Sequence, residues 1–452
     1  MSASPARMAA REVLTRVREG SAYAHEVLGA TLRRLKLSGD DASFATRLAY
    51  GSIQTEGTLD EAIDRHLGGK RIEPRVRDAL RVSAYELLYL SSEQRAAVHQ
   101  GVELVRGVRK QAAGLANAVL RRIAEDSASF PWGDPETDDA ALARLYGHPV
   151  WLAKMWIAEL GRETTTAVMA ADNEPAPLFL AANPFAGPVE DARAVLRADG
   201  ALPQPCELSG CVVAGDAGAA VRGKALADGL VIAADAAAQL VARLIRARRD
   251  LTIVEVGAGR GTKTLLMQAE AVENGGPAHI YAVDVHEFKS RLLAERLERF
   301  GVPGVETLTG DATAFGSVVG APAAGSVDAV LVDAPCSGLG TLRRHPEKRW
   351  RVEPADLESL ASLGARLLEA AAVLVRPGGF VVYSTCTLAD IENARLIEVF
   401  LASEQGSTFR VDSLAEDVPT QWRRFVTPEG YFRSVPETSG ADGHFAVRLV
   451  RT

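Results

Sequence analysis

The order of hydrophobic and polar positions divides the chain into a helical first part and a later part in which strands and helices alternate. Residues 6–126 carry apolar side chains at helical spacing, as at Met8, Val13 and Val17, which predicts helices throughout. The polar stretch 127–139 contains proline and glycine and is typical of a linker. Residues 140–173 again favour helices. Short apolar runs between residues 175 and 229 predict a small mixed α/β insert.

From Gly229 onward the alternation is regular. The pattern predicts helices over 235–247, 287–300, 354–374 and 389–401, with a further helix starting at Thr262. It predicts strands over 251–256, 279–284, 327–332 and 379–384, with others near 305–308, 409 and 445–449. Such alternation favours a parallel sheet covered on both faces, as in Rossmann-like α/β domains. We therefore expect a multidomain protein with parts at 1–128 (all-α), 129–228 (linker helices and insert) and 229–452 (α/β).

Composition places the protein among soluble globular chains. Its 452 residues are too many for one ordinary domain, and 47% are hydrophobic and 24% charged. No apolar run is long enough to span a bilayer, and residues 1–11 lack the apolar core of a secretory signal. Four cysteines do not make a disulfide framework, and no pair has the C-x-x-C spacing of a zinc site. We expect a cytoplasmic monomer with reduced thiols, no metal and no membrane partner.

Charge is distributed unevenly. The whole chain has a formal net charge of −7, yet residues 1–125 contain 20 Lys and Arg against 15 Asp and Glu. A mildly basic first part fits a nucleic-acid partner. A solvated helical surface would look similar, so charge alone leaves both interpretations open.

A glycine-rich turn follows the strand predicted at 251–256. The sequence from Val254 to Lys263, VEVGAGRGTK, has the spacing G-x-G-x-G and is neither a dinucleotide fingerprint nor a Walker A loop. Asp284 ends the next strand, where a carboxylate can accept hydrogen bonds from ribose, and Asp311 follows the third strand. Together these features fit S-adenosyl-L-methionine better than a plain tight turn. The candidate cofactor residues are Gly257, Ala258, Gly259, Arg260, Gly261, Thr262, Lys263, Asp284, Asp311 and Asp333.

Two cysteines each follow an apolar run that predicts a buried strand. One lies in Asp333-Ala334-Pro335-Cys336 and the other in Ser384-Thr385-Cys386. Ligands and chemistry gather at the carboxyl ends of strands in open α/β sheets. A thiolate is a strong nucleophile, so two thiols at neighbouring strand ends indicate covalent catalysis in which one attacks and the other assists.

These two motifs make the chain resemble the RNA cytosine-5 methyltransferases of the Nop/Sun family. The helical front is similar to the NusB-like RNA-binding domain, and the pairing resembles the bacterial members that act on 16S rRNA. The first glycine motif differs from the family's usual C-A-A-P-G-G-K-T, and Ala181 and Ala234 replace a usual Arg and Gln. Further segments that carry the resemblance are Arg343-Arg344-His345-Pro346-Glu347, Trp350, Glu392-Asn393, Leu87-Leu88-Tyr89, Ala97-Val98-His99 and Asn117-Ala118-Val119-Leu120-Arg121.

The resemblance implies methyl transfer from S-adenosyl-L-methionine to cytosine C5, through a covalent bond between an enzyme thiol and C6. It assigns Cys386 as the nucleophile and Cys336 to elimination and release of the product. Asp333 would hold the base edge, and Lys263 would orient Asp333. The base must leave any stack to enter such a pocket.

Three alternatives stay open at this stage. The same chemistry could act on tRNA or on another rRNA position, or the chain could be a non-catalytic RNA-binding or assembly factor that keeps the fold.

Cys206 and Cys211 lie outside the two motifs, and we interpret them as small buried hydrophobic residues.

Overall fold

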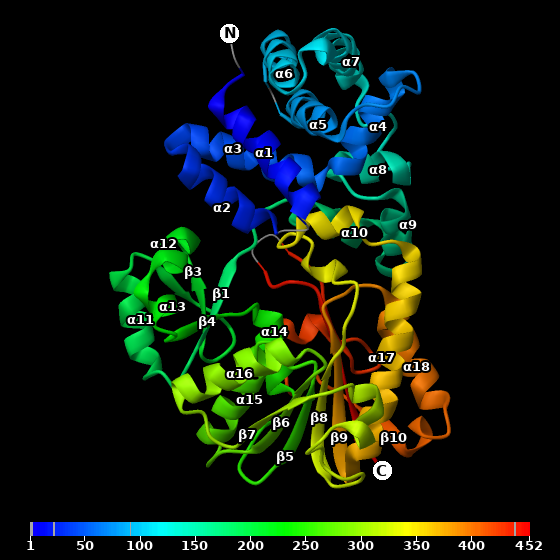
Figure 1. Ribbon diagram of the computed structural model, residues 1–452. Helices are drawn as coiled ribbons and strands as arrows, with labels where there is room; N and C mark the ends of the chain where they lie inside the picture. The colour runs from blue at the N-terminus through cyan, green and yellow to red at the C-terminus, as the bar shows by residue number, and fades with distance from the viewer. Residues whose placement is uncertain (1–2, 21–22, 91, 438–439) are drawn as a thin grey trace. The chain divides into compact units, whose positions relative to one another are not determined.

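The computed structural model describes residues 3–20, 23–90, 92–437 and 440–452. The chain forms two compact units, which are described separately (Figure 1). The first unit comprises Met1–Pro175 together with Leu342–Glu353, and the second comprises Ala176–Thr341 and Pro354–Thr452. A short segment from within the α/β sequence thus folds with the helical unit.

The first unit is built from helices, as the apolar spacing predicts. Glycine ends α4, because Gly68 adopts φ +58°, and the Glu93 side chain begins α6 by accepting bonds from the amides of Arg95 and Ala96. The buried faces of these helices form one apolar core that includes Leu48 and Leu80. The helices are α1 (Pro5–Gly20), α2 (Ala24–Leu35), α3 (Gly39–Gln54), α4 (Glu56–Leu67), α5 (Pro74–Tyr89), α6 (Gln94–Val108), η1 (Lys110–Ala112), α7 (Ala113–Asp126), η2 (Ser127–Ser129), α8 (Asp139–Tyr146), α9 (Val150–Leu160) and α10 (Arg162–Ala171).

The segment 342–353 is held in the first unit by Arg349, which lies in the short 3₁₀ helix η5 (Pro346–Trp350). Arg349 is fully buried, and its guanidinium donates to Asn173 Oδ1 at 2.9 Å and to four backbone carbonyls between 3.1 and 3.3 Å. The next residue, Trp350, donates from its indole to Gln54 O at 2.8 Å. Burial lowers the pKa of Arg349 to about 10, so it stays charged near neutral pH.

The second unit begins with a small antiparallel sheet in the order β2-β3-β1-β4. Helices α11, α12 and α13 alternate with the strands of this sheet along the chain. The apolar side chains of α11 and α13 pack on the strands. The mixed α/β insert expected between residues 175 and 229 is therefore present. Its elements are β1 (Leu178–Ala182), α11 (Val189–Ala198), β2 (Pro203–Pro205), β3 (Cys211–Ala214), α12 (Ala217–Arg222), α13 (Lys224–Ala227) and β4 (Val231–Ala233).

The remainder of the second unit is one large sheet with the order β10-β12-β9-β8-β5-β6-β7, in which β11 also pairs with β12. Its elements are α14 (Ala236–Arg243), β5 (Thr252–Val256), α15 (Thr262–Glu273), β6 (His279–Asp284), α16 (Glu287–Phe300), β7 (Val305–Thr309), η3 (Ala312–Ser317), β8 (Val327–Asp333), η4 (Leu339–Thr341), α17 (Pro354–Leu374), β9 (Val375–Thr385), η6 (Asp390–Glu392), α18 (Ala394–Ala402), η7 (Gly406–Thr408), β10 (Phe409–Asp412), η8 (Thr420–Phe425), β11 (Phe432–Ser434) and β12 (His444–Arg451).

The strands β5 to β9 are parallel, as the alternation predicts. The expectation of an entirely parallel sheet is wrong at one edge, because β12 runs antiparallel to β9, β10 and β11. Among the residues that the structure describes between β10 and β12, none forms an α-helix, so these strands lack the crossover that a parallel connection needs. The sheet is therefore mixed.

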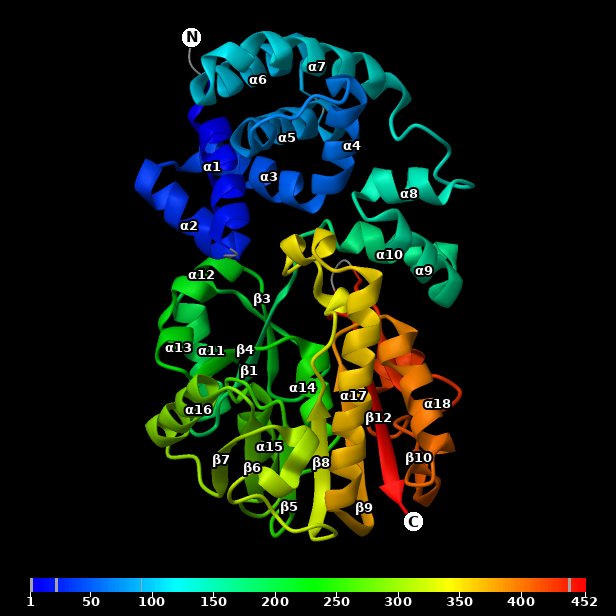
Figure 2. The same cartoon turned by 45° about the vertical axis from the view of Figure 1, so that its right-hand side comes forward.

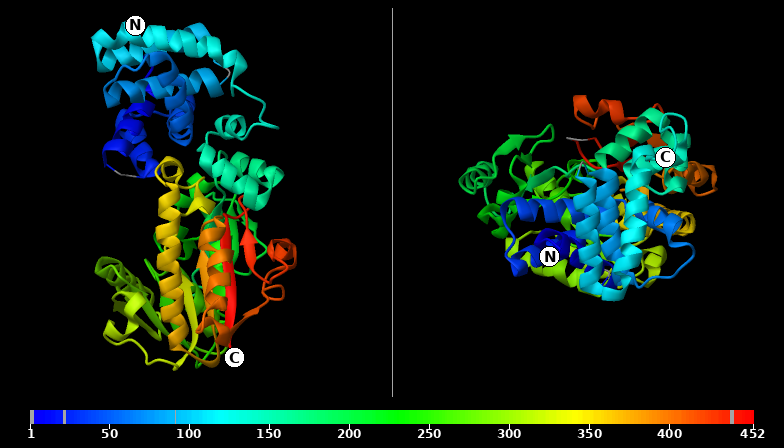
Figure 3. Two further views of the ribbon diagram at one scale, coloured as in Figure 1. Left: turned by 90° about the vertical axis from the view of Figure 1, so that its right-hand side faces the viewer. Right: turned by 90° about the horizontal axis from the view of Figure 1, so that it is seen from above.

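Helices cover both faces of the large sheet (Figures 2 and 3). Val330 and Val332 of β8 point into the core beneath α17 and α18. Their neighbours Ala329 and Leu331 point into the opposite core, beneath α14 and α15. Burial on both sides explains why β8 is nearly continuously apolar. It also leaves the carboxyl ends of the strands as the place for polar chemistry.

We predict that replacing Arg349 with methionine destabilises the first unit by about 3–5 kcal/mol, because several buried acceptors lose their charged donor. Hydrogen exchange of the α3 and α10 amides in the full chain should show faster opening. Lys348→Met is the matched control, since Lys348 is only partly buried and should change exchange little. Equal protection in the Arg349 and Lys348 variants would contradict this role.

Candidate active site

The turn between β5 and α15 requires glycine at two positions. Gly257 adopts φ +79°, and a Cβ there would lie 2.6 Å from the carbonyl oxygen of Asp333. Gly261 adopts φ +77°, and its Cβ would lie 2.0 Å from Leu293. The tight turn packs the backbone against β8 and α16, and α15 starts directly after it at Thr262.

Asp284, at the end of β6, organises the same loop. Its two carboxylate oxygens accept bonds from Gly259 N at 3.0 Å and His286 N at 2.8 Å, and Lys289 Nζ lies 3.6 Å away. Asp311 follows β7 and caps η3 by accepting from the backbone and side chain of Thr313. These bonds lower the pKa of Asp311, so it is a carboxylate at neutral pH.

A cavity of about 520 Å³ lies at the carboxyl ends of β5, β6, β7 and β8 in the second unit. It brings together most of the predicted site, and the predicted residues that line it are Gly257, Gly259, Asp284, Asp311, Asp333, Cys336 and Cys386. The remaining predicted cofactor residues, Ala258, Arg260, Gly261, Thr262 and Lys263, belong to the adjoining loop and helix start and do not line the cavity.

The two motif cysteines meet at the edge of this cavity. Cys336 Sγ and Cys386 Sγ are 3.5 Å apart, and Cys386 N donates to Cys336 Sγ at 3.4 Å. Both thiols are only partly buried. The hydrogen bond to Cys386, together with burial, raises the pKa of Cys336 well above its ordinary value. Cys336 is therefore the protonated partner of the pair.

Asp333 and Lys263 form an ion pair beside the thiols. Lys263 Nζ donates to Asp333 Oδ2 at 2.6 Å, and the Ser384 hydroxyl lies 3.4 Å from Asp333 Oδ1. Burial opposes the charge on Lys263, but the Asp333 carboxylate outweighs it and raises the pKa of Lys263. The lysine is thus a fixed cation that orients this carboxylate at the cavity edge.

A buried polar network joins the two cysteine loops. Ser337 donates to the Glu392 carboxylate from its amide at 2.8 Å and from its hydroxyl at 2.5 Å, and its hydroxyl lies 2.7 Å from that of Thr387. Asn393 donates to Thr387 O at 3.0 Å and interrupts the helix expected over 389–401, which instead forms η6 and α18. The hydrogen bonds of Ser337 and Thr387 could not be predicted from the sequence, because their partners are distant along the chain.

Other residues that sequence reasoning missed surround the cofactor loop. His286 and Lys289 line the cavity at the start of α16. Glu255 is fully buried beneath the loop and accepts the Thr264 hydroxyl at 2.5 Å. Burial raises the pKa of Glu255 to about 8, so it is mostly neutral at neutral pH. The sequence shows that Glu255 interrupts an apolar strand, but it does not reveal that this side chain is protonated.

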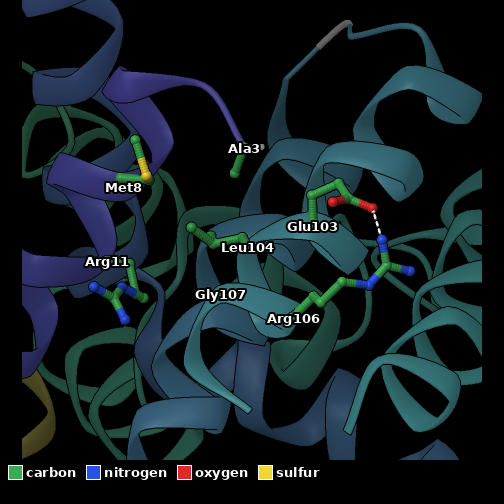
Figure 4. Close-up of a pocket in the computed structure, with 7 residues that line it drawn as sticks. All are labelled: Ala3, Met8, Arg11, Glu103, Leu104, Arg106 and Gly107. Atoms are coloured by element: carbon green, nitrogen blue, oxygen red, sulfur yellow. Dashed lines mark hydrogen bonds and ion pairs between the residues drawn. The ribbon is translucent and has the colours of Figure 1, made fainter. Parts of the chain in front are cut away.

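A separate cavity of about 260 Å³ lies within the helical unit, between α1 and α6. Figure 4 shows its lining, in which Glu103 and Arg106 form an ion pair. None of the predicted site residues lines it.

Across the described ranges, no group of three His, Cys, Asp or Glu side chains could hold a metal ion. In the same residues, no helix combines the length and apolar character needed to cross a membrane.

The parallel core, the glycine loop after its first strand and the carboxylates at the following strand ends define a Rossmann-like methyltransferase domain. Family models match three stretches of the chain. Residues 242–450 match the model of 16S rRNA methyltransferase RsmB/F, residues 4–125 match the NusB family, and residues 148–218 match the ferredoxin-like domain of RsmF/B-like methyltransferases.

Full-length relatives give the same result. The chain is 30% identical over 451 residues to the probable ribosomal RNA small subunit methyltransferase B of Bacillus subtilis, covering 98% of both chains. It is 30% identical to the ribosomal RNA small subunit methyltransferase B of Thermus thermophilus, covering 100% of this chain and 99% of the relative. The chain belongs to the RsmB/F methyltransferase family, with the NusB and ferredoxin-like domains that precede the catalytic domain in this architecture.

Solved structures share the fold. The crystal structure of PH0851 covers 100% of both chains with a TM-score of 0.78 at 23% identity. NSun6 from Pyrococcus horikoshii, solved with SFG, covers 66% of this chain and 97% of its own, with a TM-score of 0.55 at 18% identity.

Proposed function

We propose that this protein transfers a methyl group from S-adenosyl-L-methionine to C5 of a cytosine in 16S rRNA. The observation that carries the proposal is the pair of thiols 3.5 Å apart at the edge of a cavity that Asp284 and Asp311 also line. Cytosine C5 is a weak nucleophile, so its methylation needs covalent activation by a thiol. A non-catalytic RNA-binding protein would need no such thiol.

The residues around the glycine loop fit the cofactor. Asp284 keeps lone pairs that can accept hydrogen bonds from ribose hydroxyls, and the tight turn lets a ligand approach the backbone closely. Asp311 lines the adjacent part of the cavity, where it can receive the adenine side. The bound cofactor supplies an electrophilic sulfonium methyl group. Ala258, Arg260, Gly261 and Thr262 act by shaping the loop.

Cys386 begins the reaction in this account. Its Sγ forms a bond to cytosine C6, and the electron pair of the C5–C6 double bond moves so that C5 becomes nucleophilic and takes the methyl group. Asp333, oriented by Lys263, holds the amino and N3 edge of the base. Removal of the C5 proton then restores the double bond as the Sγ–C6 bond breaks.

Cys336 is suited to remove that proton as a thiolate, after its own proton has passed to water. Its hydrogen bond to Cys386 is the largest cause of its raised pKa. This bond is lost when Cys386 is bonded to the base, so Cys336 becomes easier to ionise at the stage when a base is needed. Burial keeps the pKa of Cys336 high, which makes its thiolate a strong base.

The RNA target is inferred from relatives and domains. The relatives are named as methyltransferases of the small-subunit ribosomal RNA. We propose that residues 1–128 dock structured RNA, that 129–228 also bind RNA, and that 229–452 carry the chemistry, with the protein acting as a cytoplasmic monomer. Cytosine in tRNA or at another rRNA position is the main competing substrate.

The two cysteines should give different products when each is replaced. Cys386→Ala should abolish methyl transfer, because no thiol can activate C5. Cys336→Ala should still allow attack and methylation but trap the enzyme on its RNA. A denaturing gel with labelled RNA should therefore show a stable protein–RNA adduct for Cys336→Ala alone.

The double variant Cys336→Ala, Cys386→Ala is the control and should give no adduct. An adduct that forms with Cys386→Ala alone would reverse the assignment of the two thiols, and an adduct that persists in the double variant would exclude both thiols as its source. Cys206→Ala should behave like the wild type on the same gel, which excludes a general effect of removing a thiol.

Replacing Asp284 tests the cofactor placement. Asp284→Asn loses one charged acceptor and should weaken S-adenosyl-L-methionine binding by about 2–3 kcal/mol, or roughly thirty- to 150-fold. Isothermal titration calorimetry measures the Kd. The exposed Asp250→Asn is the control and should bind normally. An unchanged Kd for Asp284→Asn would exclude this role.

A further inference from the structure

A second pair of thiols lies in the small sheet, at the hairpin that joins β2 and β3. The register pairs Pro205 with Val212, so one step further places Cys206 opposite Cys211. Directly opposed residues in antiparallel strands point to the same face and have Cα atoms about 4.5–5.5 Å apart. Disulfides need Cα separations of about 4.4–6.8 Å. If the pairing continues by one residue beyond Pro205 and Val212, the backbone spacing suits a Cys206–Cys211 bond.

The two thiols lie at the same apolar cluster and differ in access. Cys211 belongs to a buried apolar cluster, and Cys206 packs against the same cluster. Cys211 is 1% exposed, and its Sγ accepts a bond from Gln239 Nε2 at 3.4 Å. Cys206 is only half-buried, which corrects its interpretation as a buried hydrophobic residue. It lines a cavity of about 250 Å³ beside Trp422 and Phe425.

The hairpin favours a thiolate at Cys206 and a thiol at Cys211. The hydrogen bond from Cys211 is the largest effect, and the backbone amides of Glu207 and Leu208 add to it, so the pKa of Cys206 falls to about 7. The same bond and burial raise the pKa of Cys211. An accessible thiolate beside a buried protonated thiol is the arrangement found where one sulfur reacts with an oxidant and a second resolves it.

We propose that Cys206 and Cys211 form an oxidation site, at which a hydroperoxide converts the two thiols into a disulfide. The inference rests on the hairpin register and on the packing of both cysteines at one apolar cluster, and it does not depend on the proposed methyl transfer.

The chemistry balances with hydrogen peroxide as the oxidant. The Cys206 thiolate attacks one peroxide oxygen, so that the S–O bond forms and the O–O bond breaks, giving a sulfenic acid and hydroxide. Cys211 then attacks the sulfur of Cys206, the S–S bond forms, and the S–O bond breaks. Water leaves with the proton of the Cys211 thiol. The two thiols lose two electrons, and the peroxide is reduced to two waters.

The bond would close the β2–β3 hairpin at a point where it already contacts its neighbours. The loop that it closes, 207–210, already accepts a bond from Ala182 N at Gly210 O at 2.9 Å. Gln239, which holds Cys211, also donates to Ala234 O at 2.9 Å, at the start of α14. Oxidation therefore ties the hairpin at a point that contacts both β1 and α14.

Peptide mapping of the full-length protein tests the proposal. The reduced protein is treated with a stoichiometric amount of hydrogen peroxide, alkylated and digested with trypsin, which leaves both cysteines in the peptide 198–222. Cleavage after Glu207 then separates them. The expected result is two fragments that stay linked until a reductant is added. The close pair Cys336 and Cys386 lies in other tryptic peptides, so the same digest reports on it separately.

Single variants establish the order of events. In Cys211→Ser, the sulfenic acid of Cys206 should persist and react with dimedone, whereas in Cys206→Ser the thiol of Cys211 should stay reduced. In the untreated wild type, Cys206 should be alkylated roughly tenfold or more faster than Cys211 near neutral pH. The proposal is overturned if both thiols remain fully alkylated after peroxide. It is also overturned if oxidation is confined to Cys336 and Cys386, or if Cys206 is oxidised further with no linked fragment.

Discussion

The parallel pairing of β8 with β9 is the constraint on which the site depends. Asp333 lies opposite Ser384 in this register, so the residues that follow the two strands leave the sheet at the same edge. Ala334 N bonds to Ser384 O and Gly340 N bonds to Cys386 O, each at 2.9 Å, which continues the pairing beyond the strands. Two motifs fifty residues apart thereby place their thiols within one hydrogen bond of each other. A shift in this register would separate the thiols and break the network of Ser337 and Glu392.

That single contact also makes two chemically identical side chains unequal. The bond between the sulfurs raises the pKa of Cys336, and covalent engagement of Cys386 would remove the bond. One thiol can thus act first and the other later without a further catalytic group. Cys206 and Cys211 are unequal as well, because the pKa of Cys206 is lowered and that of Cys211 is raised. The pairs differ in setting, because one lies at a strand edge and the other in a hairpin.

Local patterns were enough to predict the parts of the fold that depend on local forces. Apolar runs such as 327–332 predicted buried strands, and the glycines at 257 and 261 predicted a tight turn that the backbone confirms with positive φ angles. The pattern of apolar side chains did not reveal that β12 is antiparallel. The direction of a strand depends on the segment that connects it to its neighbours and not on its own side chains. Nor could it predict the partners of Arg349, which lie 176 to 295 positions away in the sequence.

The cysteine motifs and the segment Glu392-Asn393 were recognised in the sequence, while the contacts that join them were not. Ser337 and Glu392 interact only because the strand register brings distant loops together.

The central claim is the identity of the methylated atom. Purified protein should be incubated with unmodified 16S rRNA, tRNA and methyl-labelled S-adenosyl-L-methionine, and the nucleosides analysed by mass spectrometry. The account predicts label in 5-methylcytidine from 16S rRNA; label in another nucleoside, or none in either RNA, would contradict it.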